Sequence, residues 1–325
     1  MAATVLASKA YDLSGGALRE DLEDIIYDIS PQDTFFMNNA GRGKASSTTH
    51  EWLTDSLTAA AANKEIEGNA FSAQARSLPS RLKNYTQISR KDFEVTGTAQ
   101  KVDNAGMREL MAYHTVRAGK ELKRDMELEM LANNPASAGT SVSARVSGGV
   151  PNWIYALNHI KLTGQTVWST TAPVSGFATA TIPGASTTAI TEADLKSALG
   201  KAWSCGGNVD TLLCTSATYN LLSAFTGLAT RFRDVGSRKQ AQIIGAADVY
   251  VSAFGSHNIQ LSRYMPTGTL YCLQMDTWRV DYLRSFQTVP IAKIGDAERA
   301  MILAEWTLVA KTPRANTKIN GILNG

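Results

Sequence analysis

The clearest periodicity in the chain lies between residues 103 and 133, where apolar side chains recur at helical spacing. Asp103 or Asn104 is the expected N-cap, and Asn133 with Pro135 is the expected stop. A helix of about 30 residues would span roughly 40 Å, which is long for a globular domain. Its apolar stripe would consist of Met107, Leu110, Met111, Leu122, Met126 and Met130.

The surface of this predicted helix carries two pairs of opposite charge spaced four residues apart, Arg117 with Glu121 and Lys123 with Glu127. A long helix usually packs in a bundle, but no other helical pattern in the chain has a similar length. The sequence therefore does not predict a helical bundle.

The chain begins with a polar arm of about 30 residues that contains one short helical pattern. The apolar positions of this pattern are Leu22, Ile25, Ile26 and Ile29. Pro31 ends it, because the residue before a proline avoids the helical conformation. Terminal segments of this kind are ordered only where another part of the structure holds them.

The second half of the chain alternates between helix and strand patterns. Residues 192–203 predict an amphipathic helix with Thr191 as its cap, and residues 216–225 predict another. The inner side of the first helix is expected to carry Leu195, Leu199 and Trp203. Residues 163–191 are rich in Thr, Ser, Ala, Gly and Pro and indicate a loop or exposed hairpin.

Strand patterns follow, with a tight turn expected at Ser256 and His257. The predicted strands are residues 206–215, 247–255, 258–265, 269–275, 278–283 and 300–313. Helices that alternate with strands and are followed by a run of strands are typical of an α+β fold.

Residues 81–98 have the composition of a strand but no consistently apolar face. Charged side chains occupy both faces, whereas a strand in an ordinary sheet has one face to bury. We therefore expect a two-stranded hairpin that projects and is covered by other chains, since an isolated hairpin is marginally stable in water. The residues expected to contact neighbouring chains are Arg81, Lys83, Tyr85, Arg90, Lys91, Asp92 and Glu94.

This interpretation has a consequence for folding. Deletion of residues 65–90 should leave a folded subunit, because the hairpin would contribute nothing to the subunit's own core.

Composition narrows the class of protein. The chain has 325 residues, of which 44% are hydrophobic, so a sizeable core is expected. The formal net charge of +3 is too small to predict a dedicated nucleic-acid-binding protein. The three cysteines have no metal-ligand or disulfide spacing and are expected to be reduced core residues. No apolar run predicts a membrane span or a signal peptide.

Motifs for chemistry are almost absent. The sequence NNAGRGKASS departs from a phosphate-binding loop at Asn38 and Ala45, so we expect a flexible turn there. His50 and Glu51 begin a zinc-protease pattern whose second histidine is replaced by Thr54. The sequence thus predicts no catalytic residues, no cofactor and no metal site.

Several motifs, in order along nearly the whole chain, resemble the major capsid proteins of tailed bacteriophages with the Hong Kong 97-type fold, and most closely the branch of the SU ten-type phage major head protein. The stretches that carry the resemblance are DLEDIIYDISPQDTFF, HEWLTDSL, NYTQI, AGKELKRDMELEML, AWSCGGNVDTLLC, VYVSAFG, LAEWTLVAK and INGIL. Each motif is weak by itself, and the ordered set carries the specificity.

The resemblance implies a domain organisation. Residues 1–35 would be the N-terminal arm and residues 36–102 the extended β-hairpin loop. The peripheral domain would combine residues 103–149, which hold the long spine helix, with residues 291–325. Residues 150–290 would form an α+β axial domain around the five-fold and quasi-six-fold axes.

The same resemblance implies a function. The chain would self-assemble through hexamers and pentamers into an icosahedral head around double-stranded DNA. Its DNA contacts would be weak and non-specific, scaffolding, portal and decoration proteins would be its other partners, and it would leave the host cytoplasm for the virion. The alternatives are an α+β hydrolase or transferase with a dimerising hairpin, and another virion component such as a tail-tube subunit.

The sequence departs from the family pattern in two respects, which concern covalent crosslinking and scaffolding. Lys64, Lys83 and Lys91 are available for covalent crosslinking, but no motif supplies the asparagine and carboxylate that such a reaction needs, so no crosslinking is expected. No long acidic segment precedes the arm, so scaffolding is expected from a separate protein or from none.

Overall fold

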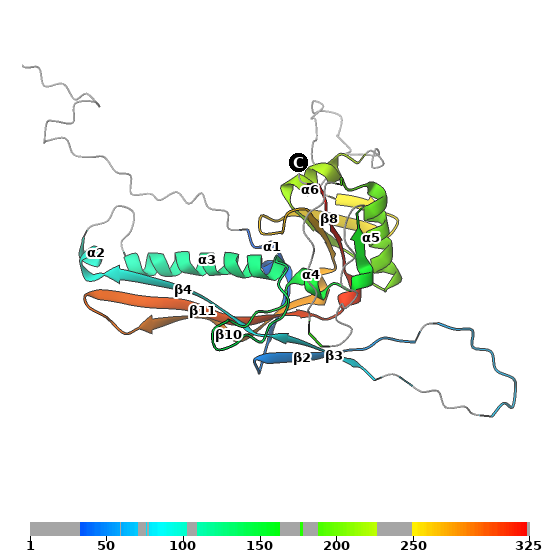
Figure 1. Cartoon of the computed structure of the whole chain (residues 1–325), viewed down its shortest axis with the longest axis horizontal. Helices are drawn as coiled ribbons and strands as arrows, with labels where there is room; N and C mark the ends of the chain where they lie inside the picture. The colour runs from blue at the N-terminus through cyan, green and yellow to red at the C-terminus, as the bar shows by residue number, and fades with distance from the viewer. Residues whose placement is uncertain are drawn as a thin grey trace, which may run out of the picture.

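The computed structural model describes residues 33–58, 60–70, 76, 78–102, 109–162, 176–177, 188–225 and 249–323. Figure 1 shows an elongated lobe, in which one long helix lies along a narrow sheet, next to a compact lobe of strands and helices. A two-stranded ribbon and a long loop project from the junction of the two lobes. Both helices and strands contribute to the core, which agrees with the predicted α+β class.

The elongated lobe contains a four-stranded sheet in the order β1-β10-β11-β4. Its centre is the long antiparallel pair of β10 (Trp278–Ile291) and β11 (Ala297–Ala310). β4 (Gln87–Thr96) pairs antiparallel with β11, and β1 (Gly41–Lys44) pairs parallel with β10. The outer face of β4 is exposed, whereas residues 302–310 of β11 are buried on both faces.

The long helix, α3 (Leu110–Leu131), packs over β4 and β11 (Figure 1). The side chains of Leu122, Met126 and Met130 on this helix are fully buried, as predicted for its apolar stripe. The predicted start at Asp103 or Asn104 is wrong, because Glu109 is the N-cap and has an extended backbone. Residues 103–108, including Met107, lie outside the described residues.

The compact lobe contains a six-stranded sheet of mixed parallel and antiparallel pairs, in the order β5-β12-β9-β6-β8-β7. Helices α5 (Glu192–Ser204) and α6 (Ser216–Ser223) pack against it. The strands are β5 (His159–Lys161), β6 (Thr211–Cys214), β7 (Val249–Ser252), β8 (Gly255–Leu261), β9 (Thr269–Leu273) and β12 (Thr317–Asn320).

The chain passes between the two sheets at other places than residues 150 and 290. β10 already belongs to the four-stranded sheet from Trp278 onward, and β12 returns the chain to the six-stranded sheet. The remaining short elements are α1 (Phe35–Asn39), α2 (Gly97–Lys101), α4 (Val150–Trp153), η1 (Ala156–Asn158), η3 (Met275–Thr277) and η4 (Pro313–Ala315).

The helix predicted at residues 192–203 is confirmed as α5. Thr191 and Asp194 form a capping box, in which each side chain accepts a hydrogen bond from the other residue's backbone N–H. Leu195 and Leu199 are buried, but Trp203 is 60% exposed, so its predicted place on the inner side is wrong. Trp203 is turned about 80° around the helix axis from Leu195, and the buried stripe continues through Ala198 and Ala202 instead.

The tight turn predicted at Ser256 and His257 is also misplaced. Those two residues pair with β7 as part of β8, and the turn consists of Ala253 and Phe254. Gly255 follows the turn with a φ of 126°, a conformation that favours glycine. The glycine therefore fixes the position of the turn.

The strand-like stretch at residues 81–98 is two strands rather than one. β3 (Ser80–Tyr85) pairs with β2 (Thr49–Thr54) in the two-stranded ribbon, whereas β4 joins the four-stranded sheet. The break falls at Thr86, where the alternation shifts by one residue. Before it the buried positions are even-numbered, as in Leu82, and after it they are odd-numbered, as in Val95.

The expectation that this stretch has no face to bury, and that residues 36–102 form one long hairpin, is therefore wrong. Each strand has an inward face of its own, but the change of phase at Thr86 hides it when the sequence is read as one strand. The hairpin itself is limited to β2, β3 and the segment between them.

Candidate assembly surfaces

The segment between β2 and β3, residues 55–79, projects away from both lobes and is called the extended loop here (Figure 1). Every described residue of it is exposed. The large apolar side chains among its described residues are almost fully open to solvent: Leu57 is 97%, Leu78 88% and Ile66 81% exposed. A monomer gains nothing from such an arrangement, since each exposed apolar group would be more stable when covered.

The root of the extended loop is fixed firmly to the subunit. Trp52 of β2 donates its indole N–H to the carbonyl oxygen of Ala310, at 2.9 Å. Asn84 of β3 donates its amide N–H to the carbonyl oxygen of Leu308, at 2.7 Å. Both bonds join the ribbon to the end of β11, so the loop leaves the subunit in a defined direction.

A buried carboxylate holds the break between β3 and β4. Glu305 of β11 is buried and lies 2.7 Å from the guanidinium of Arg145 and 2.8 Å from that of Arg284. The hydroxyl of Thr86 donates a third bond to it at 2.8 Å. A buried charge is stable only when it is paired in this way. The position of the break therefore depends on residues that are distant from it in sequence.

The seven residues predicted to contact neighbours fall into two groups. The first group, Arg81, Lys83 and Tyr85, lies on β3 in the ribbon. Arg81 and Lys83 both pair with Glu51 of β2, at 3.2 and 2.8 Å. These pairs lower the pKa of Glu51, chiefly through the hydrogen bond from Lys83. Tyr85 stacks on Phe177 with ring centroids 4.3 Å apart.

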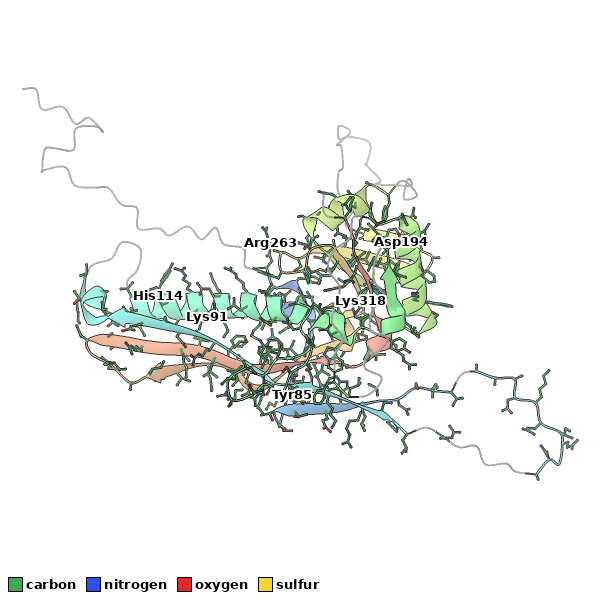
Figure 2. All side chains as sticks on the ribbon, in the orientation of Figure 1. Tyr85, Lys91, His114, Asp194, Arg263 and Lys318 are labelled. Carbon is green, nitrogen blue, oxygen red and sulfur yellow. The ribbon has the colours of Figure 1, made fainter. Side chains whose placement is uncertain are left out.

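The second group, Arg90, Lys91, Asp92 and Glu94, lies on β4, so the structure does not bring all seven together. Lys91 points toward α3 and pairs with Asp125 at 2.7 Å, whereas Arg90 and Asp92 pair with each other on the outer face at 3.4 Å. Glu94 pairs with Arg299 of β11 at 3.0 Å. Figure 2 shows Lys91 below α3 and Tyr85 in the ribbon, well apart.

Sequence reasoning missed the role of Glu127. The expected pair with Lys123 is not what holds this carboxylate; Glu127 is buried and accepts backbone hydrogen bonds from Phe36 and Met37 of α1, each 2.8 Å long. Burial raises its pKa, and the two hydrogen bonds only partly oppose that shift. The i,i+4 pair of Arg117 and Glu121 is present at 3.0 Å.

A second exposed apolar surface lies on the compact lobe. β7 is the edge strand of the six-stranded sheet, and its side chains Val249 and Val251 are exposed. Beside it, the rings of Trp203 and Phe254 lie 5.9 Å apart. An unpaired edge next to exposed apolar side chains favours contact with another chain.

Catalytic and ligand-binding chemistry is not evident in these surfaces. The described residues contain no cluster of His, Cys, Asp and Glu that could hold a metal ion. The described helices include none that is long and apolar enough to cross a membrane. All three cysteines are unpaired; Cys214 and Cys272 are buried as predicted, whereas Cys205 is exposed.

The phosphate-loop candidate is a strand. Residues 41–44 form β1, so the predicted flexible turn is wrong. Gly43 is required by packing, because a Cβ there would lie only 2.3 Å from the Oδ1 atom of the buried Asp281.

A long helix on a narrow sheet, a compact sheet lobe and a projecting loop match a known family. The family model of the SU10 major capsid protein matches residues 4–323, almost the whole chain. The chain belongs to the SU10 major capsid protein family. A curated relative, the major capsid protein of Escherichia phage Phieco32, is 27% identical over an alignment of 342 positions that covers 94% of each chain.

Solved structures show the same fold at low sequence identity. The capsid of cyanophage A-1(L) superposes with a TM-score of 0.67 at 11% identity, over 94% of this chain and 97% of that one. The capsid of a native GTA particle gives 0.64 at 11% identity, over 98% and 100% of the two chains. The SrpI encapsulin of Synechococcus elongatus gives 0.57 at 9% identity, over 98% and 96%.

The predicted identity is thereby confirmed: the chain is a major capsid protein, a structural component of the virion that builds phage capsid shells. The fold is the Hong Kong 97-type capsid fold. The alternatives of an α+β enzyme and of a tail-tube subunit receive no support from these comparisons.

Proposed function

We propose that copies of this chain assemble as hexamers and pentamers into an icosahedral shell around double-stranded phage DNA. The observation that carries the proposal is the extended loop, which holds Leu57, Ile66 and Leu78 open to solvent on a firmly attached root. Such a loop has no function in a monomer and suits a neighbour's surface.

The energetics fit a shell rather than a single tight pair. Covering one large aliphatic side chain contributes about 1.5–3 kcal/mol, and ordering the loop offsets part of this. The gain per contact is therefore modest. Closure of a shell repeats it many times, so that stability comes from multivalency.

The charged residues predicted to contact neighbours retain that role in the proposal. Arg81, Arg90 and Asp92 have more than half of their side chains exposed, and exposed ion pairs contribute only about 0–1 kcal/mol. These side chains can exchange their partners within the subunit for partners across an interface. Lys83, Tyr85, Lys91 and Glu94 would help to hold the ribbon and β4 in position at that interface.

The domain roles follow the two sheets. The four-stranded sheet with α3 would be the peripheral domain, and the six-stranded sheet with the exposed edge strand β7 would be the axial domain that meets its copies around the symmetry axes. Residues 1–35 would act as the arm and the extended loop would overlap a neighbour. The boundaries at residues 102, 150 and 290 would shift to the ends of the strands described above.

Other partners follow from the role of a shell. DNA contacts would be weak and without sequence preference, because the net charge is only +3. Scaffolding, portal and decoration proteins would bind during or after assembly, which would begin in the host cytoplasm. The chain would carry no catalytic role and form no covalent crosslinks.

The test is to replace Leu57, Ile66 and Leu78 together by serine. We expect the variant to keep its melting temperature as a subunit but to yield few or no closed shells in negative-stain micrographs. A matched control replaces three exposed polar residues of the same loop, Thr58, Lys64 and Glu67, by serine and should assemble. Normal shells from the apolar variant would contradict the proposal.

A further inference from the structure

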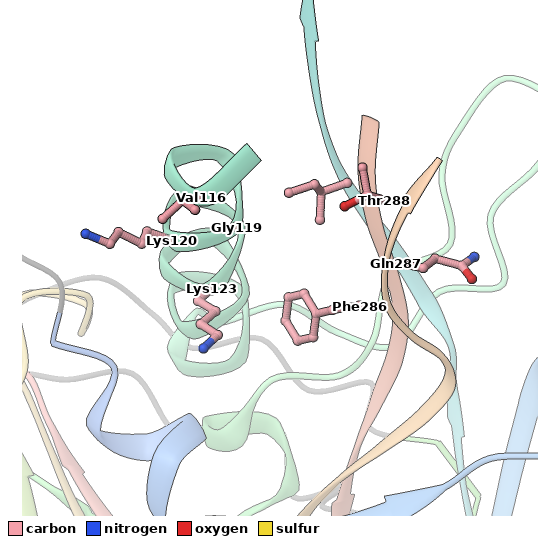
Figure 3. Close-up of a pocket in the computed structure, with 8 residues that line it drawn as sticks. Val116, Gly119, Lys120, Lys123, Phe286, Gln287 and Thr288 are labelled. Atoms are coloured by element: carbon pink, nitrogen blue, oxygen red, sulfur yellow. The ribbon is translucent and has the colours of Figure 1, made fainter. Parts of the chain in front are cut away.

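A groove lies between α3 and β10 in the elongated lobe. Its volume is about 360 Å³. Figure 3 shows the helix forming one wall and β10 the other, with the ring of Phe286 facing the helix. The lining residues are Val116, Gly119, Lys120 and Lys123 of α3, and Phe286, Gln287, Thr288 and Ile302 of the sheet.

The groove has an apolar floor that the subunit leaves open. Val116 is 62% exposed although it lies on this wall of the helix. A side chain added at Gly119 would meet only Ile302, at 3.8 Å, so helix and sheet do not close on each other here. α3 packs mainly over β4 and β11, and the outer half of β10, residues 285–291, is exposed except at the half-buried Phe286 and Val289.

One turn of α3 beyond Lys123, at Glu127, the helix is contacted by α1. The N-terminal turn of α1 is fixed to Glu127 of α3, and Phe36 packs edge-on against Trp278 at the start of β10. β1 then pairs with β10 from Arg279 to Tyr282. The groove continues this path along α3, beyond the point where β1 ends.

The chain that precedes α1 has the length to enter the groove. Lys120 lies seven residues before Glu127 on α3, which is roughly 10 Å along the helix axis. The segment from Ile29 to Thr34 can span up to about 17 Å. A helix that ends near Ile29 can therefore lie in the groove of its own subunit.

The composition of that segment complements the groove. Residues 20–29 read EDLEDIIYDI, with Leu22, Ile25, Ile26 and Ile29 at helical spacing. The polar positions carry five carboxylates, those of Glu20, Asp21, Glu23, Asp24 and Asp28. The groove offers apolar side chains on its floor and the two ammonium groups of Lys120 and Lys123 on its helical wall.

We propose that residues 20–30 form an amphipathic helix that docks into this groove of the same subunit. Its apolar face covers Val116, Phe286 and Ile302, and its carboxylates lie toward Lys120 and Lys123. The arm is then an intramolecular cover over the outer half of β10, independent of the contacts between subunits.

Crosslinking tests the docking on the full chain. In a Cys205→Ser background, Ile26→Cys is combined with Val116→Cys and treated with a short bismaleimide. Isotopically light and heavy subunits are mixed before treatment, so that a link within one chain is distinguished from a link between chains. The matched control pairs Ile26→Cys with Val142→Cys, a valine in the turn at residues 140–143 that is even more exposed than Val116 and lies outside the groove.

We expect a link within one chain for the groove pair, at least fivefold more abundant than for the control pair. Lys120→Glu with Lys123→Glu should lower its yield severalfold, whereas Lys101→Glu on α2 should not change it. A link only between chains, no link, or equal yields from the two pairs would overturn the proposal. None of these results depends on whether shells form.

Discussion

The extended loop and strand β4 have similar compositions but different environments. Both carry charges of either sign, and each has only a few large apolar residues. β4 turns Phe93 and Val95 toward α3 and pairs with β11 over its whole length, whereas every described residue of the loop is exposed. Polarity therefore does not tell whether a segment serves its own fold or a neighbour; the placement of its few apolar residues does.

The largest expected effect separates Leu82 from Leu78. Leu82 is buried at the root of the ribbon, and Leu78 is exposed in the loop only four residues before it. Replacing Leu82 by alanine should cost about 2–5 kcal/mol of unfolding free energy, because it leaves a cavity. Replacing Leu78 should change it by less than about 0.5 kcal/mol.

Denaturant unfolding of the unassembled subunit measures both values. If both variants lost the same unfolding free energy, the loop would belong to the core. If neither variant lost any, the ribbon would not belong to the core.

The next largest loss of stability is expected at Glu127, which contributes to the subunit's own fold. Replacing it by alanine leaves the N–H groups of Phe36 and Met37 buried without an acceptor, at a cost of about 1–3 kcal/mol for each group. Glu65 and Glu67 are exposed in the loop and provide the comparison. Their replacement by alanine should leave the melting temperature of the subunit unchanged. A melting temperature equally lowered by both changes would argue against this division.

The same carboxylate predicts a dependence on pH. The folded-state pKa of Glu127 is raised above its ordinary value of 4.5 by burial. The folded subunit therefore binds a proton that the unfolded chain has lost, and stability falls as the pH rises from 4.5 through the raised pKa. The difference in stability between wild type and Glu127→Gln should shift against the wild type over this window. If the unfolding free energies of the two proteins changed in parallel with pH, the raised pKa of Glu127 would be contradicted.

Much of this fold was accessible from the sequence, for reasons that are local. Thr191 and Asp194 form a capping box within four residues, and the stripe of Leu122, Met126 and Met130 repeats at helical spacing. Such features need no knowledge of the rest of the chain. Short-range chemistry therefore predicted α5, α6 and the buried stripe of α3.

The features that were missed depend on contacts that are distant in sequence. The phase change at Thr86 is held by Glu305, which is 219 residues away, and Glu127 is buried because α1 packs on it from 90 residues away. Trp203 repeats at the spacing of Leu195 and Leu199 but is exposed, because the buried stripe runs through Ala202. Nothing in the pattern around these residues marks the difference.

A buried lysine, Lys318, contrasts with the exposed Lys64 of the extended loop. Lys318 of β12 is buried and donates to the carbonyl oxygen of Pro151, and burial lowers its pKa to about 7. Folding then excludes a proton that the unfolded chain binds, so stability is lost as the pH falls from 10.5 toward 7, at up to about 1.4 kcal/mol per pH unit. Lys318→Met should abolish this slope, and exposed Lys64→Met should not. If the slope persisted in Lys318→Met, another group would be the cause of this pH dependence.

The smallest expected effect is on the charges of β4. Replacing Arg90 and Lys91 by glutamate breaks their pairs with Asp92 and Asp125, both of which are solvent-exposed. Each pair contributes about 0–1 kcal/mol, so the subunit should melt within a few degrees of the wild type. Assembly should become slower and more sensitive to salt, as light scattering would show. Unchanged assembly kinetics would show that Arg90 and Lys91 do not lie in an interface between subunits.

The central claim is that the extended loop serves assembly and not folding. Deleting residues 65–90 cannot test it, since that deletion would remove β3 and part of β4. Replacing residues 57–78 by a short Gly-Ser linker keeps both ribbon strands, and analytical ultracentrifugation with thermal unfolding then gives the answer in one preparation. We predict a folded subunit with the melting temperature of the wild-type subunit and no shell-sized particles. Shells of normal size, or a subunit that no longer folds, would contradict the account.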